Sequence, residues 1–190
     1  MDVPFKLNKA LKFLISFFAL FILLYGLNYF FVGLTIPGGY YNEWIANHVD
    51  YVSAYRSLIL KGASIFTDIA GFDNYVNKYE LRIPGISRVR MVYSCIGFNI
   101  LSFWLAFTLA YPQPLKKKLL YCISGIFLIT LMNMMRVAGL AMIRSISSLR
   151  HTQFNHHMLF NIIVYAIIFM AIRIMVNDSD GIIGNKAKAH

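Results

Sequence analysis

The sequence has 190 residues, of which 58% are hydrophobic and only 14% are charged, and its formal net charge is +10. Soluble domains are typically about 45–50% apolar and about 25% charged, so this composition indicates lipid as the main solvent and leaves little room for a soluble catalytic domain. The basic residues flank apolar runs and form no separate patch, which favours contact with an anionic membrane face and argues against a nucleic-acid partner. Two cysteines, Cys95 and Cys122, are too few for a disulfide framework, and no zinc-ligand cluster occurs, so we expect no metal and no other cofactor.

The first apolar segment runs from Ala10 to Val32 and has about the 20 residues that a helix needs to cross a bilayer. It is longer than the core of a secretory signal, which is about 7–15 residues, and no small-residue cleavage site follows it. We therefore interpret it as a retained membrane span, followed by a break at Pro37, Gly38 and Gly39.

Residues 33–90 form the longest segment between apolar runs. The part from Tyr51 to Phe72 has scattered apolar residues with basic and acidic residues among them, which predicts an amphipathic helix on the outer surface or a re-entrant helix. The part from Tyr75 to Tyr93 has strand-like composition and a turn signal at Pro84-Gly85, which predicts a short β-ribbon.

Three further segments are long and apolar enough to span a membrane, and each must be helical because a single strand cannot satisfy its backbone in lipid. The sequence therefore predicts an all-α integral membrane protein with about four transmembrane helices. We expect a single membrane-embedded domain over residues 1–176 and a loose polar tail over residues 177–190. The three later spans are Met91–Tyr111, which Pro112 and Pro114 close, Leu119–Ile143 and His157–Val176.

Lysine and arginine near the span ends set the expected orientation. Basic clusters occur before the first span, between the second and third, and at the end of the fourth, with two crossings between successive clusters. We therefore expect a multi-pass protein of the inner (cell) membrane with both termini in the cytoplasm and residues 33–90 and 144–156 outside. The clusters are Lys6, Lys9 and Lys12; Lys116, Lys117 and Lys118; and Arg173, Lys186 and Lys188.

Three polar residues within the predicted spans are candidates for function, because polar groups are costly in lipid. Cys95 lies near the start of the second span, Arg136 lies about 10 Å from the outer end of the third at 1.5 Å per residue, and His157 begins the fourth. All three are thus expected near the outer face. Their structural alternatives are a cysteine that packs as a small apolar residue, an arginine that snorkels outwards and an interfacial histidine. Cys122, near the cytoplasmic end of the third span, is interpreted as structural.

Each candidate has a polar neighbour at helical spacing. Asn133 is three residues from Arg136, Asn161 is four from His157 with Tyr165 a further turn on, and Asn99 is four from Cys95. These amides support a shared site, although amides also join helices to one another within membranes. His156, beside His157, is an alternative for the histidine role.

A thiol, an imidazole and a guanidinium together suit acyl transfer. A thiolate is a strong nucleophile that a nearby cation stabilises, and histidine can take the thiol proton and return it to a leaving amine. Arginine stays protonated and can stabilise the thiolate or an oxyanion. The set therefore suits attack on a peptide carbonyl to give a thioester, which water or another nucleophile resolves.

Three short runs resemble motifs of the exosortase/archaeosortase family over roughly residues 57–176. Val92-Tyr93-Ser94-Cys95-Ile96-Gly97 resembles the Cys-Ser-Gly motif, Asn133-Met134-Met135-Arg136 resembles Asn-x-x-Arg, and His157-Met158-Leu159-Phe160-Asn161 resembles His-x-x-x-Gly. Ile96 stands where the family has Ser and Asn161 where it has Gly. The short chain resembles the compact bacterial-type members.

The resemblance implies a membrane cysteine protease-transpeptidase with Cys95, Arg136 and His157 as catalytic residues. Such enzymes cleave the C-terminal sorting signals from exported proteins at the outer face of the membrane and transfer the proteins to an acceptor. The implied partners are the helix of the sorting signal and the lipid bilayer. The substrate motif, the acceptor, the choice between His156 and His157 and the oligomeric state stay open.

Two other interpretations fit parts of the sequence. In the first, the chain is a non-catalytic membrane component of an envelope assembly or transport system, in which Asn133 and Arg136 form a buried polar clamp. The second, a metalloprotease, is disfavoured because His151, His156 and His157 lack a His-Glu-x-x-His pattern and no acid lies in any predicted span.

Overall fold

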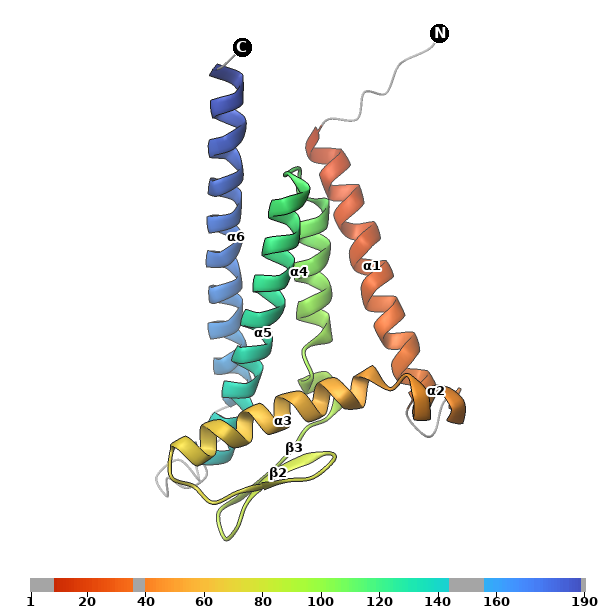
Figure 1. Cartoon of the computed structure of the whole chain (residues 1–190), viewed down its shortest axis with the longest axis vertical. Coiled ribbons are helices and arrows are strands. Elements are labelled where there is room, and N and C mark those ends of the chain that lie inside the picture. Colours follow the sequence, from red (N-terminus) through yellow and green to blue (C-terminus); the bar gives the residue numbers. More distant parts are fainter. Residues whose placement is uncertain (1–8, 36–39, 144–155, 189–190) are drawn as a thin grey trace.

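The computed structural model describes residues 9–35, 40–143 and 156–188, with side chains throughout except at residues 156–160 and 179–188. Helices dominate it, and one three-stranded antiparallel sheet of order β1-β2-β3 lies at one end of the molecule (Figure 1). The elements in chain order are α1 (Lys9–Thr35), α2 (Glu43–His48), α3 (Tyr51–Ile69), β1 (Tyr75–Val76), β2 (Glu80–Ile83), β3 (Ser87–Arg90), the 3₁₀ turn η1 (Tyr93–Cys95), α4 (Phe98–Ala110), α5 (Leu115–Ile143) and α6 (His156–Lys188).

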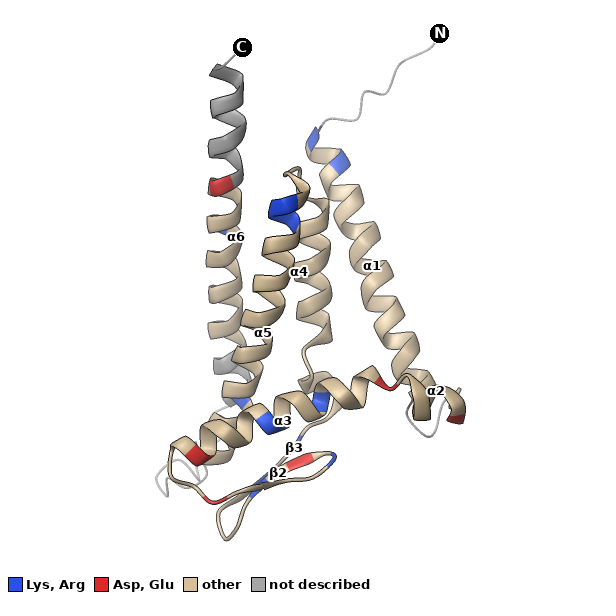
Figure 2. Ribbon diagram, in the orientation of Figure 1, with Lys and Arg blue, Asp and Glu red and all other residues tan. Residues whose placement is uncertain are grey.

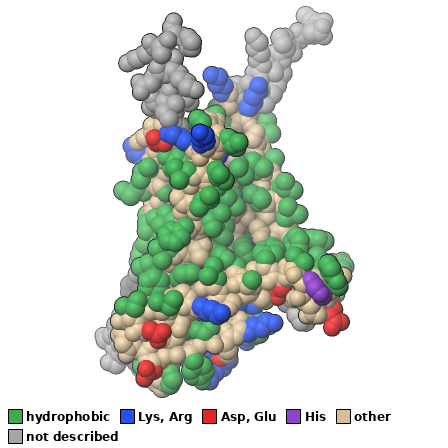
Figure 3. Space-filling model, viewed as in Figure 1, with side chains coloured by type: hydrophobic (Ala, Val, Ile, Leu, Met, Phe, Trp, Pro, Cys, Tyr) green, Lys and Arg blue, Asp and Glu red, His purple; other side chains and the backbone are tan. Residues whose placement is uncertain are grey.

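Helices α1, α4, α5 and α6 run side by side, with α1 packed on α4, α4 on α5 and α5 on α6 (Figure 1). Phenylalanines join α1 to α4: the ring of Phe17 meets that of Phe103 with centroids 5.5 Å apart, and Phe13 meets Phe107 at the same distance. Hydrophobic side chains cover the outside of this bundle between its two charged ends (Figure 3). An apolar exterior of this kind is the surface that a bilayer requires.

The bundle contains three helices that are long and apolar enough to cross a membrane, among the residues that the structure describes: α1, α5 and residues 161–178 of α6. The sequence placed a further complete span at Met91–Tyr111, and that prediction is wrong in its extent. The helix there covers only Phe98–Ala110, about 20 Å at 1.5 Å per residue against a hydrocarbon core of about 30 Å. Residues 91–97 form an irregular segment, because Gly97 adopts a left-handed conformation (φ 90°) immediately before the helix.

Close contact between α4 and α5 depends on one glycine. Trp104 of α4 is 2% exposed and its Nε1 donates to the carbonyl oxygen of Tyr121 on α5 at 2.9 Å. A Cβ at Gly125 would lie 1.8 Å from that same Nε1, so the indole occupies the space that any other residue would need.

Helix α3 lies across one end of the bundle, with the sheet beyond it (Figure 1). The sheet also contacts α5, where the Ser87 hydroxyl donates to the carbonyl of Ala141 at 2.7 Å. The Asp50 side chain caps it by accepting from the amide of Ser53 at 2.9 Å. Its apolar face, which includes Ile59 and Leu60 at 0% exposed, packs against α5. The amphipathic helix predicted from Tyr51 is thus present, with its end at Ile69.

The predicted β-ribbon differs from the observed sheet at its first strand. The hairpin β2–β3 turns at Pro84-Gly85 as expected, with Glu80 opposite Arg90 and Ile83 opposite Ser87. The first predicted strand is divided into β1 and β2, because the Asn77 side chain accepts from the amides of Tyr79 and Glu80 and so closes a tight turn.

The sheet holds one buried acid between two arginines. Glu80 is 4% exposed, accepts from Arg82 Nη2 at 3.1 Å and also pairs with Arg88. The hydrogen bond from Arg88 holds the pKa of Glu80 below its ordinary value of 4.5. The pairing therefore stabilises the sheet at pH values above that ordinary pKa, and its contribution is lost as the pH falls through the lowered one.

The two ends of the molecule differ in charge pattern: α3 and the sheet carry basic and acidic residues together, whereas lysines predominate at the other end (Figure 2). Lys9, Lys12 and the lysines at the start of α5 gather at the end opposite α3 (Figure 2). There Lys117 pairs with Asp178 of α6, which also accepts from the hydroxyl of Tyr121 at 2.8 Å. Helix α6 therefore runs on past Val176, where the fourth span was predicted to end.

Candidate active site

Cys95 lies in the irregular segment between the sheet and α4. The amide of Met91 donates to the carbonyl of Tyr79 at 2.8 Å, which keeps the segment attached to the sheet. The amide of Cys95 then donates to the carbonyl of Val92 at 2.9 Å within the turn η1. Cys95 is half-buried and reduced, whereas the next residue, Ile96, is fully buried. Cys95 therefore precedes α4 and shares no helical face with Asn99, contrary to the expected spacing.

Asn133 of α5 fixes this segment from inside the bundle. Asn133 is only 7% exposed, and its Nδ2 donates to the carbonyl oxygens of Cys95 at 3.1 Å and Ile96 at 2.7 Å. A Cβ at Gly97 would lie 3.3 Å from that Nδ2, so glycine leaves room for the amide as well as allowing the positive φ. Irregular backbone is tolerated at membrane depth only where protein satisfies it, and Asn133 satisfies two carbonyls here.

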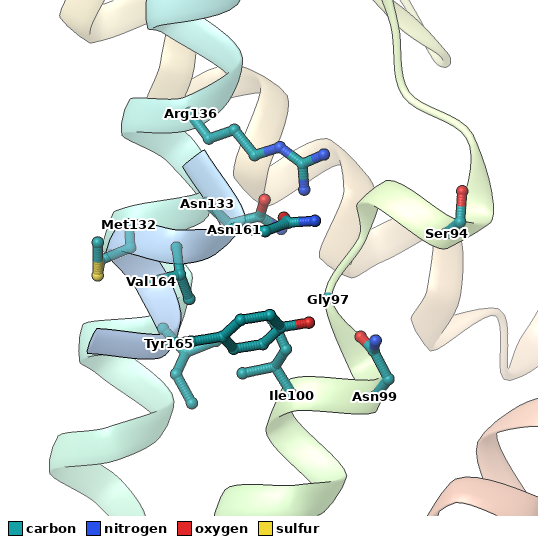
Figure 4. Close-up of a pocket in the computed structure, with 11 residues that line it drawn as sticks. Ser94, Gly97, Asn99, Ile100, Met132, Asn133, Arg136, Asn161, Val164 and Tyr165 are labelled. Atoms are coloured by element: carbon teal, nitrogen blue, oxygen red, sulfur yellow. The ribbon is translucent and has the colours of Figure 1, made fainter. Parts of the chain in front are cut away.

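A polar pocket of about 90 Å³ lies beside the clamped segment. Arg136, one turn along α5 from Asn133, extends into it towards the loop that carries Ser94 (Figure 4). The guanidinium and several amides thus supply hydrogen-bond donors that could stabilise a negatively charged oxygen. The lining residues come from the loop and from α4, α5 and α6: Ser94, Gly97, Asn99, Ile100, Ile129, Met132, Asn133, Arg136, Asn161, Val164 and Tyr165.

The structure brings three of the six predicted site residues together. Asn133, Arg136 and Asn161 line one pocket, and the Cys95 loop borders it through Ser94 and Gly97, although Cys95 itself is not among the lining residues. Cys122 lies fourteen residues before Arg136 on α5, about 21 Å away at 1.5 Å per residue. It is buried and distant from the pocket, as its structural interpretation requires.

The histidine part of the prediction lies outside the described side chains. His156 and His157 form the start of α6, and only the helical path of their backbone is described. His151 falls outside the described residues altogether. Among the residues that the structure describes, no group of three or more His, Cys, Asp or Glu could hold a metal ion.

Two features of the pocket were not assigned a role from the sequence. Gly97 lets the chain turn into α4 and makes room for Asn133, and a glycine just before an apolar run was the available signal. Asn99 and Tyr165 were noted only as polar neighbours of Cys95 and His157, whereas both line the pocket themselves. The available signal in the sequence is that each is a polar residue within an apolar run.

The two hydrogen bonds from Asn133 Nδ2 to the carbonyls of Cys95 and Ile96 form a clamp, and removing this clamp tests its importance. We expect Asn133→Leu, which leaves two carbonyls unpaired, to slow substrate processing by about 10–100-fold, since a misplacement of about 1 Å can cost that much. The matched control is Thr130→Val, one turn earlier on α5, which removes a partly buried 2.8 Å hydrogen bond to the Tyr55 hydroxyl. If the two variants have comparable melting temperatures and only Asn133→Leu processes substrate slowly, the result would support a role of the clamp in the site. Equal activity of the two variants would contradict it.

The fold and the pocket define a polytopic membrane protein with a cysteine-bearing loop and an arginine beside it. A family model described as transmembrane exosortase matches residues 8–174. The chain therefore belongs to the transmembrane exosortase family. Searches of curated proteins and of solved structures gave no match.

Proposed function

We propose that this exosortase is a membrane cysteine protease-transpeptidase that acts through Cys95, Arg136 and a histidine at the start of α6. The observation that carries the proposal is the clamp: one helix, α5, holds the Cys95 segment through Asn133 and presents Arg136 one turn away in the adjoining pocket. The segment and the guanidinium therefore have a defined relative position.

The proposed reaction has two steps. The Cys95 sulfur attacks a peptide carbonyl carbon and its proton passes to His157, which delivers it to the amine that leaves as the C–N bond breaks. Arg136 stabilises the oxyanion of the tetrahedral intermediate. Water, an amine or a hydroxyl group then attacks the thioester, gives up its proton to the histidine and releases the Cys95 thiol.

His157 is the proposed base because of its place in the helix. Asn161 and Tyr165, four residues apart, both reach the pocket from α6. Position 157 lies four residues before Asn161 on the same helical face. His156 lies about 100° around the helix from that position. Substituting each histidine in turn and measuring substrate processing therefore decides which one acts as the base.

We further propose the orientation in the membrane. The lysines at the starts of α1 and α5 lie at one end of the bundle (Figure 2). The pocket lies nearer the other end, because its lining comes from the loop before α4, the start of α4, the second half of α5 and the early part of α6. Basic residues near span ends are retained in the cytoplasm, which places the pocket at the outer face of the inner membrane. The proposed substrates are exported proteins whose C-terminal sorting signal ends in a membrane helix.

One observation favours the alternative of a non-catalytic membrane component. Cys95 is not among the residues that line the pocket, and the amide of Asn133 is used in structural hydrogen bonds. In that case Asn133 and Arg136 form a polar clamp that shapes a partner-binding surface, and the thiol has no chemical role.

Trapping the acyl-enzyme distinguishes the cysteine protease-transpeptidase from the non-catalytic membrane component. The purified protein is incubated with a substrate that carries an apolar C-terminal helix and a basic tail, quenched in acid, digested and analysed by mass. We expect a substrate peptide attached to the fragment that contains Cys95 and none on that containing Cys122, which is the internal control. Absence of any adduct on Cys95, while substrate is being cleaved, would overturn the mechanism.

A further inference from the structure

An apolar cavity of about 230 Å³, open on one side, continues the polar pocket along α4 and α6. The two spaces share Asn99, Ile100 and Tyr165, and the apolar one adds residues further along α4 and α6 as well as one from α1. The path therefore leads away from the Cys95 loop, towards the end that carries the lysines. The residues added are Phe21, Phe103 and Ile168.

Three polar side chains lie at or beside the junction of the two spaces: Asn99 and Tyr165 line both, and Asn161 lines the polar pocket. The amides of Asn99 and Asn161 and the hydroxyl of Tyr165 turn towards one space from α4 and α6 (Figure 4). Tyr165 is 54% exposed, and Asn99 is exposed as well. Within the described part of the chain, none of the three has a hydrogen-bond partner, unlike Asn28, which accepts from the Tyr51 hydroxyl and donates to Ser102. They therefore do not join helices in the way that buried amides of bundles do.

Unpaired polar groups at this depth suit a ligand that is itself short of hydrogen bonds. A peptide bond inside a membrane helix must leave the helix to be cleaved, and each unwound residue exposes an N–H and a C=O that lipid cannot satisfy. Amides both donate and accept, and a phenol does the same. The three side chains therefore match an extended peptide backbone, and the apolar cavity beyond them matches its apolar side chains.

We propose that Asn99, Asn161 and Tyr165 form a subsite that binds the unwound backbone of the substrate on the membrane side of the cleaved bond. The cavity lined by Phe21, Phe103 and Ile168 takes the first apolar side chain of the substrate's helix. This inference rests on the proposed function. It adds where the substrate leaves its helical form and which groups replace the hydrogen bonds it loses.

The kinetic test uses the full-length protein in lipid nanodiscs with a substrate that the wild type processes. Asn99→Leu, Asn161→Leu and Tyr165→Phe each remove hydrogen-bonding atoms at nearly constant size. We expect KM to rise about fivefold for each hydrogen bond lost, with little change in kcat and in the rate at which a maleimide labels Cys95. Asn28→Leu is the matched control, because it removes a paired membrane amide outside the subsite and should lower the melting temperature without raising KM.

A binding test decides the case even if those variants do not fold. A photo-crosslinking amino acid replaces Phe103 in the Cys95→Ala background, with the same replacement at the lipid-exposed Phe127 as control. We expect a crosslink at 103 to the substrate segment next to the cleaved bond, and none at 127. Unchanged KM in the folded variants, or crosslinks at 127 only, would overturn the subsite. Processing by Cys95→Ala would instead overturn the proposed function.

Discussion

Replacing Cys95 by alanine is expected to reduce substrate processing by on the order of 10⁴-fold or more, because a covalent mechanism has no substitute for its nucleophile. The fold should survive the change. Both hydrogen bonds from Asn133 go to backbone carbonyls, which alanine retains, and Cys95 is only half-buried. Processing is measured as the rate of appearance of the shortened substrate, and folding as the melting temperature of the purified protein.

The other cysteine is the control for this experiment. Cys122→Ala changes a buried thiol about 21 Å along α5 from Arg136 at 1.5 Å per residue, and we expect it to leave processing intact. Wild-type rates in Cys95→Ala would remove the thiol from the mechanism. They would favour the non-catalytic interpretation of the polar clamp.

Replacing Arg136 by alanine is expected to lower kcat by about 10²–10³-fold, the usual cost of removing an oxyanion donor. The kcat of Arg136→Lys should lie between those of Arg136→Ala and the wild type, because lysine keeps the charge but loses the planar arrangement of donors. The clamp is formed by Asn133 and should persist in both variants. The measurement is kcat and KM for the tailed substrate, together with the melting temperature.

Arg173 offers a matched comparison for Arg136. It is an exposed arginine on α6, distant from the pocket along the helix, and Arg173→Ala should leave kcat unchanged. A fall in melting temperature for Arg136→Ala, with unchanged turnover of the protein that remains folded, would show that the guanidinium supports structure alone.

The long helices of the bundle and the α5 side of the pocket could be predicted, because they depend on the length of apolar runs and on the period of the helix. Apolar runs of bilayer length predicted α1, α5 and α6, and the spacing of three residues between Asn133 and Arg136 correctly predicted that they face the same way. These properties are local, since every helix repeats each 3.6 residues whatever its neighbours are.

The surroundings of Cys95 could not be predicted in the same way. Hydropathy counts Met91–Tyr111 as one continuous apolar run, but it contains no information on the backbone angles of Gly97 or on a carbonyl that accepts from another helix. The turn at Asn77, which divides the predicted strand, likewise depends on one side chain bonding to its own backbone. The hydrogen bonds from Asn133, by contrast, join residues far apart in the sequence and form only when the helices are assembled.

The pairing of two roles on α5 has a mechanical consequence. Asn133 and Arg136 are rigidly linked by one helical turn, so a tilt or slide of α5 carries the nucleophile's backbone anchor and the positive charge together. A movement of α6, which lines the opposite side of the pocket, changes the width of the pocket without changing that spacing. A change in the width of the pocket therefore leaves the Cys95 segment and the Arg136 guanidinium in their relative position, while it moves the start of α6, where the proposed histidine lies.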